Sequence, residues 1–312
     1  MRVVFMGSPA FAVLSLERLV MANHDIVAVY TQPDRPAGRG RAVMPPPVKI
    51  AAMEKGLTVV QPESLKSHEA VSQLAGFRPD VIVVCAFGQV LTQAVLDVPP
   101  LQCINLHFSL LPRHRGASPV AAAILVGDEI TGVSIQLVRV ALDTGPVLAS
   151  AAVPISPRDN TGTLTAKLAV SGAHLLDEAL LGWLRQERKP RPQDNTQATY
   201  LPRIKREEGE IDWHLPADEI WRRIRAFNPW PGSYTHWQGR QLKVLEAVPV
   251  SGDEVPEPGR VISLTGREAV LGVGTGGGVL GLLTVQLEGK KAMSAADFLR
   301  GHRELNGVSL GI

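Results

Sequence analysis

DVIVVCAF at residues 80–87 and QCINLH at residues 102–107 are the runs that decide the fold. Both are short, apolar and almost without charge, which is typical of strands that are buried on both faces of a parallel sheet. Similar runs occur at residues 2–6, 25–30 and 57–60. We therefore predict that these five segments form one mainly parallel sheet.

Helical patterns and two later strands complete the first part of the chain. Helices are predicted at residues 10–22, 48–56, 117–127 and 161–184. Further strands are predicted at residues 131–140 and 146–155. Alternation of strands and helices indicates a doubly wound α/β domain with right-handed crossovers. Ser8 and Pro9 are predicted to be the cap and first-turn residue of the first helix.

The composition changes after residue 184. Residues 185–205 are polar and contain prolines, which is typical of a linker. A short helix at 218–227 is followed by brief strands with Gly and Pro turns, a pattern that favours a small β-barrel. A final helix is predicted to begin at Ser294. We therefore predict an α/β domain at 1–184, a linker at 185–205 and a β-barrel domain at 206–312.

The overall composition excludes several classes of protein. The 312 residues are 45% hydrophobic and 20% charged, which excludes a disordered chain, and the net charge of +2 gives no general preference for acidic partners. Two cysteines, Cys85 and Cys103, are too few for a disulfide scaffold and are predicted to be small buried side chains. Neither a signal peptide nor a membrane-spanning run is predicted, so we expect a cytoplasmic location.

Asn105 and His107 end the second of the quoted runs. Side chains two apart in a strand face the same way, and carboxyl ends of parallel strands open onto the ligand crevice. An Asn amide can donate to an oxyanion and a His can transfer protons, so the pair suits attack on a carbonyl group. Asp143, in the turn LDTG at 142–145, is the predicted partner of His107. The residues alone equally allow a turn Asn, a hydrogen-bonded core His and an ordinary turn.

A basic loop is the other feature that suggests binding. Residues 33–47 contain Arg35, Arg39 and Arg41, with only Asp34 opposing them. Three arginines on a Gly- and Pro-rich loop could contact a phosphate backbone, although a solvated surface loop explains them equally well. No spacing typical of a metal site is present, and GSPAF after the first strand is not a dinucleotide-binding motif.

Several motifs together resemble one family along nearly the whole chain. They are FMGSPAFAV at 5–13, TQPDRPAGRG at 31–40, INLHFSLLPRHRGASP at 104–119, LDTG at 142–145, AFNPWPGS at 226–233 and GKKAMSAADFL at 289–299. These motifs resemble those of the methionyl-tRNA formyltransferase family. The Asn-x-His and SLLP-x-x-RG combination is specific to folate-dependent formyltransferases, and the basic loop and AFNPWP segment point to the branch that uses tRNA.

The resemblance implies a function for each part of the chain. It implies a Rossmann-like catalytic domain, an OB-like tRNA-binding domain, 10-formyltetrahydrofolate as formyl donor and methionyl-initiator tRNA as acceptor. It also implies that no metal is needed, and we expect a monomer. The implied catalytic residues are Asn105, His107 and Asp143. The implied folate-contacting residues are Ser109, Leu110, Leu111 and Pro112. The implied tRNA-binding residues are Arg35, Arg39 and Arg41.

Two departures and two alternatives accompany this resemblance. Phe108 stands where the family commonly has a small residue, and Pro146 follows Gly145 where more polar residues are often seen. A relative with the same Asn, His and Asp could instead formylate a small amine such as glycinamide ribonucleotide or a nucleotide amino-sugar. A non-catalytic RNA-binding module is the alternative from a different class of protein.

Overall fold

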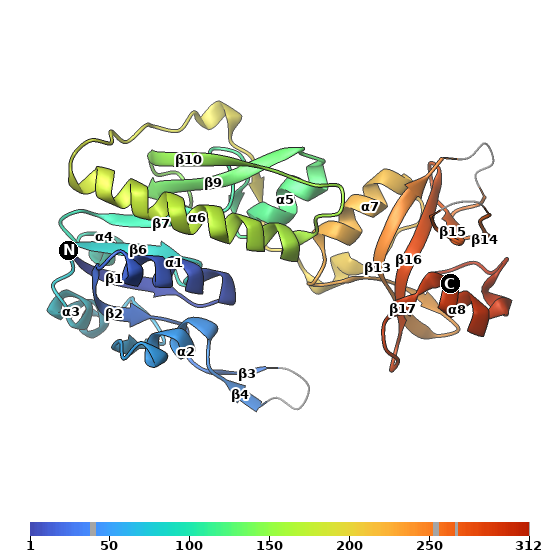
Figure 1. Cartoon of the computed structure of the whole chain (residues 1–312), viewed down its shortest axis with the longest axis horizontal. Coiled ribbons are helices and arrows are strands. Elements are labelled where there is room, and N and C mark those ends of the chain that lie inside the picture. The colour runs from blue at the N-terminus through green and yellow to red at the C-terminus, as the bar shows by residue number, and fades with distance from the viewer. Residues whose placement is uncertain (38–41, 252–255, 266–267, 312) are drawn as a thin grey trace. The chain divides into compact units, whose positions relative to one another are not determined.

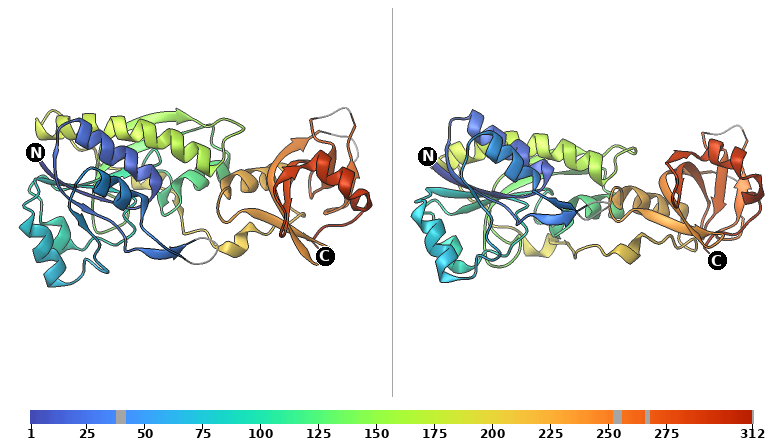
Figure 2. Two further views of the ribbon diagram at one scale, coloured as in Figure 1. Left: turned by 60° about the horizontal axis from the view of Figure 1, so that its bottom comes forward. Right: turned by 90° about the horizontal axis from the view of Figure 1, so that it is seen from below.

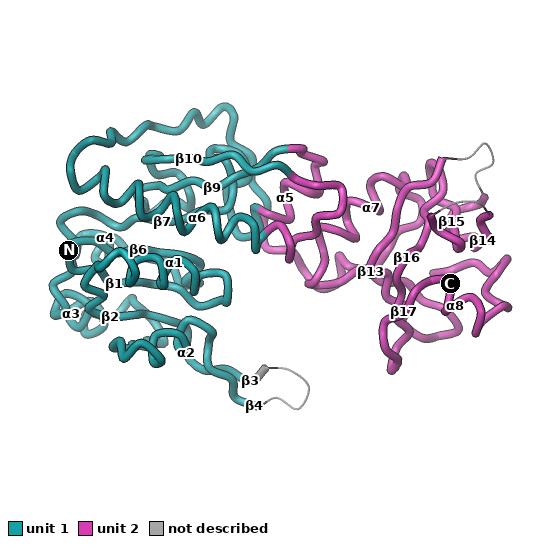
Figure 3. The backbone as a smooth tube through the Cα atoms, viewed as in Figure 1, with its two compact units in different colours: residues 1–119, 130–154, 165–201 teal, residues 120–129, 155–164, 202–312 magenta. Residues whose placement is uncertain are grey.

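The computed structural model describes residues 1–37, 42–251, 256–265 and 268–311. These residues form two compact units, which Figure 3 shows in different colours. Unit 1 contains residues 1–119, 130–154 and 165–201. Unit 2 contains residues 120–129, 155–164 and 202–312. Neither unit is therefore a single continuous stretch of the chain.

Unit 1 is built on a seven-stranded sheet with the strand order β10-β9-β7-β6-β1-β2-β5 (Figure 1). The strands are β1 (Arg2–Gly7), β2 (Asp25–Tyr30), β5 (Val59–Val60), β6 (Val81–Cys85), β7 (Cys103–His107), β9 (Ile130–Leu137) and β10 (Val147–Pro154). Five neighbouring strands, in the spatial order β5-β2-β1-β6-β7, pair in parallel. At the other edge of the sheet, β9 is antiparallel to β7 and β10 is antiparallel to β9. The prediction of a mainly parallel sheet is confirmed.

Helices cover both faces of this sheet (Figure 2). The helices of this part of the chain are α1 (Ala10–Met21), α2 (Pro47–Glu54), α3 (His68–Gly76), α4 (Gln93–Leu96) and α6 (Thr161–Leu184). Leu74 of α3 and Val95 of α4 pack with Val4, Ile82 and Cys103 of the sheet in one buried cluster. On the other face, α6 lies against β7, where Gly172 contacts Leu106. The doubly wound arrangement is confirmed, and α3 and α4 lie where no helix is predicted.

Ser8 differs from its predicted role as a helix cap. The N-cap of α1 is Pro9, which makes no side-chain cap hydrogen bond. The Ser8 hydroxyl instead donates to Phe87 O at 3.2 Å and accepts from Gln32 N at 3.1 Å. Because Phe87 and Gln32 follow β6 and β2, Ser8 joins the loops at the carboxyl ends of three neighbouring strands.

Unit 2 is built on an antiparallel sheet with the order β12-β13-β16-β15-β14, and β17 pairs with β16. Its strands are β12 (Ser233–Trp237), β13 (Arg240–Val250), β14 (Val261–Ser263), β15 (Leu271–Gly274), β16 (Val279–Leu287) and β17 (Met293–Ser294). The helices after residue 202 include α7 (Ala217–Ala226) and α8 (Ala295–Gly301), and Ser294 caps α8 by accepting from Asp297 N. The sheet curls around a core that includes Trp237, Leu280 and Phe298, which agrees with the expected OB-like domain.

Two segments from the middle of the chain belong to unit 2. They are residues 120–129, which include most of α5 (Pro119–Val126), and residues 155–164. Thr161 donates to Ala226 O of α7 at 2.6 Å, and the Arg225 guanidinium lies 3.4 to 3.5 Å from backbone carbonyls of the 155–164 segment. The sequence, by contrast, predicts that both segments belong to the α/β domain. The boundaries at 184 and 206 stay a prediction.

Candidate active site

Asn105 and His107 lie at the carboxyl end of β7. Leu106 between them packs against Gly172 of α6. Because successive side chains in a strand alternate between faces, Asn105 and His107 both point away from α6, as predicted. His107 is buried and Asn105 is half-buried.

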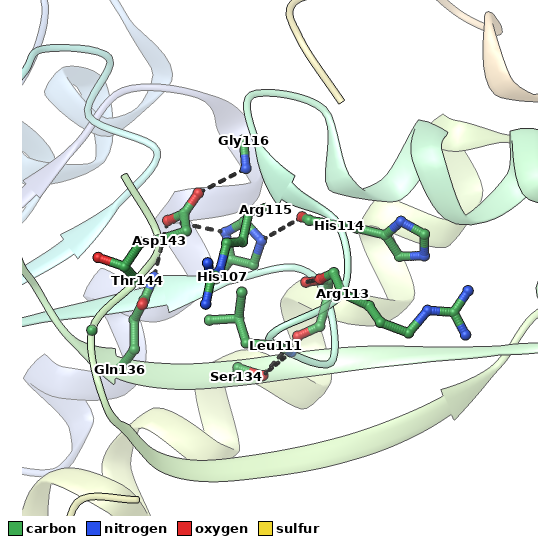
Figure 4. Close-up of polar contacts among 12 residues, drawn as sticks. His107, Leu111, Arg113, His114, Arg115, Gly116, Ser134, Gln136, Asp143 and Thr144 are labelled. Carbon is green, nitrogen blue, oxygen red and sulfur yellow. Dashed lines mark hydrogen bonds and ion pairs between the residues drawn. The ribbon is translucent and has the colours of Figure 1, made fainter. Parts of the chain in front are cut away.

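Asp143 reaches His107 because the chain turns back after β9. β9 is antiparallel to β7 and therefore ends beside the start of β7, where Val138 N donates to Cys103 O at 2.8 Å. The residues that follow run back along the sheet and bring the Asp143 Oδ1 atom to 3.6 Å from His107 Nδ1 (Figure 4). Both side chains are less than a tenth exposed, at 7% and 8%. The structure thus pairs two of the three predicted catalytic residues.

The second ring nitrogen of His107 determines the tautomer. His107 Nε2 lies 2.9 Å from the backbone oxygen of His114. A carbonyl oxygen only accepts hydrogen bonds, so this contact assigns a proton to Nε2. Nδ1 is therefore the nitrogen that can exchange a proton on the side of Asp143 and a substrate.

Neutral groups hold the Asp143 carboxylate. Its Oδ2 accepts from Gly116 N and its Oδ1 accepts from Gln136 Nε2, both at 2.9 Å. Within the described ranges no lysine or arginine forms an ion pair with this carboxylate. Its negative charge is consequently directed at His107, which is the arrangement that orients an imidazole and stabilises its charged form.

Asn105 offers a side-chain amide to the same place. Its side chain makes no hydrogen bond to any other described residue, and it lies within β7 and not in a turn. An Asn amide carries two donors and one acceptor, so this group can serve a bound molecule. The interpretation of Asn105 as a residue that satisfies turn backbone is therefore wrong.

The loop after β7 contains the four residues predicted to contact folate. Ser109 is fully buried, and its hydroxyl donates to Arg113 O at 2.6 Å. Ser134 of β9 fixes the same loop, because its hydroxyl donates to Ser109 O at 2.7 Å and accepts from Leu111 N at 3.1 Å. The half-buried members of the loop are Leu110, Leu111 and Pro112. The Ser109 hydroxyl closes the turn, so it is the other three side chains that could touch a ligand.

Phe108 occupies a defined place beside this loop. The side chain is buried, with 6% of the residue exposed, and its ring packs against Phe11 of α1 with centroids 5.1 Å apart. A tilted aromatic contact of this kind stabilises both rings beyond their burial. The bulky residue at this position is therefore part of the contact between α1 and the loop.

A return segment, defined here as residues 191–201, lies against this site. It begins where Arg191 pairs with Val147 and ends with β11 (Tyr200–Leu201), which pairs in parallel with β8 (Arg115–Gly116). Gln193 donates to the backbone oxygens of Asp143 at 2.9 Å and Gly145 at 2.6 Å. The segment falls within residues 185–205, which the composition predicts to be a linker, but in the structure it is part of unit 1.

The predicted tRNA-binding arginines are only partly described. Arg35 lies in β3 (Arg35–Ala37), which pairs with β4 (Ala42–Met44), and it is exposed. Arg39 and Arg41 lie outside the described residues. Asp34 bonds to Lys49 Nζ at 2.7 Å, and this hydrogen bond with that from Gln61 lowers the pKa of the Asp34 carboxyl. Asp34 is therefore engaged with Lys49, and Arg35 keeps its charge for other partners.

Cys85 and Cys103 are unpaired and buried, and burial raises the pKa of each thiol to about 12. The prediction that they act as small buried side chains is confirmed. Among the described residues, no group of three or more His, Cys, Asp or Glu side chains is placed to hold a metal ion. A search of the same residues finds no helix with the length and apolar character that a membrane span requires.

Five residues of the site have no individual role predicted from the sequence, although two of them form the RG of the SLLP-x-x-RG motif. They are Arg115, Gly116, Ser134, Gln136 and Gln193. Ser134 and Gln136 lie in the apolar run of β9 and are almost fully buried. A polar side chain inside a buried strand needs a hydrogen-bond partner, and that signal could have identified both.

The fold and the site define a class: a two-domain α/β protein with a buried histidine–aspartate pair and, beside it, an asparagine amide that has no hydrogen-bond partner among the described residues. Residues 1–180 match the family described as formyl transferase, and residues 203–303 match its C-terminal domain. The chain belongs to this formyl transferase family.

Relatives and solved structures agree with this assignment. The methionyl-tRNA formyltransferase of Dehalococcoides mccartyi is 50% identical over 312 residues, which cover 100% of this chain and 99% of that protein. The methionyl-tRNA formyltransferase of Chloroflexus aurantiacus is 48% identical and covers 96% of this chain and 97% of its own. The crystal structure of HypX from Aquifex aeolicus in complex with tetrahydrofolic acid has a TM-score of 0.63 at 18% identity, covering 96% of this chain and 47% of that one. This last likeness supports the fold.

Proposed function

We propose that the protein transfers the formyl group of 10-formyltetrahydrofolate to the free amino group of methionyl-initiator tRNA. The observation that carries the proposal is the His107–Asp143 pair with the free amide of Asn105 on the same face of β7. The acceptor is supported by relatives of that name, which match this chain from end to end at about half identity.

The residues beside the pair suit a folate donor. Asn105 presents an amide without a partner among the described residues, which fits a formyl oxygen. Leu110, Leu111 and Pro112 form a half-buried loop with apolar side chains, which fits an aromatic ring system. We assign these three residues, together with Ser109 as the residue that closes their turn, to donor binding.

The residues then have the following roles in catalysis. The neutral amino group of the methionyl ester attacks the formyl carbon, so that a carbon–nitrogen bond forms and the carbonyl oxygen becomes an oxyanion. Asn105 and the protonated form of His107, through its Nδ1–H, donate hydrogen bonds to this oxyanion. The bond to the folate nitrogen then breaks, and the proton lost by the amine is passed to that nitrogen with the help of Asp143. Asp143 also orients His107, and no covalent enzyme intermediate forms.

The rest of the proposal concerns the tRNA. Arg35, Arg39 and Arg41 contact the phosphate backbone, and the domain after residue 206 supplies further tRNA contacts. The exposure of Arg35 and the curled antiparallel sheet of unit 2 support these roles. We propose that the protein acts as a monomer in the cytoplasm, with domains at 1–184 and 206–312.

A transfer assay tests the proposal directly. Purified protein is given 10-formyltetrahydrofolate and one of three acceptors: charged initiator tRNA, glycinamide ribonucleotide or a nucleotide amino-sugar. We expect formylation of the methionyl-tRNA alone. Efficient formylation of either small amine in its place would establish the alternative acceptor class. Binding of tRNA with no transfer to any acceptor would indicate a non-catalytic RNA-binding protein.

A further inference from the structure

Gln193 of the return segment is held in one orientation by Arg115. Its Oε1 accepts from Arg115 Nε at 3.1 Å and from Arg115 Nη2 at 2.8 Å. Its amide nitrogen donates to the backbone oxygens of Asp143 and Gly145. Turning the amide over would set its NH2 group against the guanidinium and its oxygen against two carbonyls. The orientation of the Gln193 amide is therefore fixed by the hydrogen-bond donors that face its oxygen and the acceptors that face its nitrogen.

The arginine that holds Gln193 is itself buried and satisfied. Arg115 is 9% exposed, and its Nη2 also donates to Asn195 Oδ1 at 2.8 Å. A buried guanidinium needs acceptors for its donors, and here the return segment supplies them. Arg115 and the return segment therefore depend on each other for their placement.

The return segment also contacts the other partner of His107. Thr199 Oγ1 accepts from His114 N at 2.8 Å, and Thr199 O accepts from Arg115 N at 2.9 Å. His114 is the residue whose backbone oxygen accepts from His107 Nε2. One stretch of chain thus holds the backbone on both sides of the imidazole.

Asp143 needs such support because of its backbone conformation. Its φ of 54° lies in the left-handed region, which a residue with a side chain adopts only at some cost. The segment that carries it runs along the sheet without strand pairing from Val138 to Pro146. Its carboxylate keeps two other donors, Gly116 N and Gln136 Nε2, so loss of Gln193 would loosen Asp143 without releasing it.

We infer that Gln193 is a positioning residue for the reaction: through the backbone of Asp143 and Gly145 it sets the alignment of Asp143 with His107. The inference deepens the proposed function and rests on it only where transfer is assayed. Gln193 does not touch the reacting atoms, and its effect passes through Asp143.

The first test compares two glutamines of the return segment. Gln193→Ala removes both bonds to the turn, whereas Gln197→Ala removes a side chain that bonds only to Asp194 Oδ2, at 3.0 Å in its own turn. For Gln193→Ala we expect kcat to fall about 10- to 50-fold with both KM values within about twofold, because misalignment affects the transition state more than substrate binding. Gln197→Ala should retain the wild-type kcat.

A double-mutant cycle then tests the route of the effect. If Gln193 acts through Asp143, adding Gln193→Ala to Asp143→Asn should lower kcat by less than about twofold further. If Gln193 had only a general structural role, the fold-losses in kcat of the two single variants would instead multiply in the double variant. The isosteric Gln193→Glu keeps the acceptor for Arg115 but cannot donate to the two carbonyls, and it replaces Gln193→Ala if that variant is poorly folded.

A substrate-free measurement separates this inference from the proposed function. The ring nitrogens of His107 are observed by NMR in the protein labelled at histidine, with His302 as an internal reference in unit 2. We expect Gln193→Ala to move the His107 signals and to leave those of His302 in place. Unchanged His107 signals, an unchanged kcat, or multiplicative losses in the cycle would each overturn the inference. Shifted His107 signals in a protein that transfers no formyl group would uphold the positioning and reject only the proposed reaction.

Discussion

Unit 1 contains two buried histidine–aspartate pairs, and their surroundings differ. His107 and Asp143 lie 3.6 Å apart at the end of β7, and His24, directly before β2, lies 3.5 Å from Asp177 of α6. All four side chains are less than a tenth exposed. The distance between the ring nitrogen and the carboxylate oxygen, and the burial of the side chains, are therefore nearly the same in the two pairs. These two properties do not by themselves distinguish a catalytic pair from a structural one.

The groups that hold each carboxylate make the difference. Asp177 Oδ2 accepts a hydrogen bond from Arg18 Nε at 3.0 Å and forms an ion pair with Arg18 Nη2 at 2.8 Å, so its charge is neutralised by a cation. Asp143 is held by a backbone amide and a glutamine, which leave its charge for His107. A buried carboxylate that is already paired with arginine contributes to the contact between helices, whereas one held by neutral donors can act on a histidine.

The largest expected effect tests the proposed catalytic role of the His107–Asp143 pair. Asp143→Asn keeps the shape of the side chain but removes the charge that faces His107. We expect kcat to fall roughly 100- to 1,000-fold, because the imidazole loses its orienting partner. Steady-state transfer to methionyl-tRNA measures this loss, and Asp177→Asn is the matched control that should keep at least half of the wild-type kcat. Similar losses in both variants would show that the two pairs do not differ as described.

Asn105→Ala is expected to have the next largest effect. Removal of one oxyanion donor typically costs about 2.7 to 4 kcal/mol of barrier, so kcat should fall about 100-fold or more. The half-buried position of Asn105 and its lack of side-chain partners predict a melting temperature close to that of the wild type. Transfer kinetics and thermal unfolding are measured on the same sample. A variant with a near-wild-type rate would contradict the oxyanion role.

The structural pair predicts a loss of stability in place of a loss of rate. Asp177→Asn leaves Arg18 and His24 without their carboxylate, and Arg18 is partly exposed, so we expect about 2 kcal/mol less unfolding free energy. Denaturation by urea measures this change. Glu178→Gln, at the exposed neighbouring position of α6, is the control and should change stability by less than about 0.5 kcal/mol. If Asp177→Asn and Glu178→Gln had the same unfolding free energy, the Asp177 pair would have no structural role.

The smallest expected effect concerns the basic loop. Arg41→Ala should raise the KM for tRNA a few-fold and reduce the slope of log affinity against log salt by about 0.7 to 0.9, with no change in the KM for the folate. Binding measured at several salt concentrations gives the slope. Lys66→Ala, which removes an exposed cation outside this loop, should leave the slope unchanged. Identical slopes for Arg41→Ala and the wild type would exclude the loop from the tRNA contacts.

Much of unit 1 could be predicted because its signals are local. The buried runs at β6 and β7 specify strands by composition alone, and strand alternation is enough to place Asn105 and His107 on one face. Asp143 could be named as a partner because a turn residue after a later strand is a reasonable candidate. The route by which Asp143 arrives could not be predicted, since it depends on β9 being antiparallel to β7.

The return segment could not be predicted because composition misleads there. Residues 185–205 are polar and contain prolines, so they lack the apolar periodicity that marks packed structure. Within them, the return segment is held by hydrogen bonds that Gln193 donates and Thr199 accepts, and the partners lie about 50 to 85 positions earlier in the chain. Bonds between polar groups so distant in sequence leave no periodic signal. The same reason explains why the sequence places residues 155–164 in the α/β domain, whereas in the structure they belong to unit 2.

The pairing of β11 with β8 also determines where this protein can be divided. A fragment that ends at residue 184 would contain Asn105, His107 and Asp143 but would leave Gln193 and Thr199 on the other piece. A fragment meant to keep the whole site should therefore extend at least to Leu201, the last residue of unit 1. In this chain the gene segment that encodes the catalytic module extends beyond the last strand of its sheet.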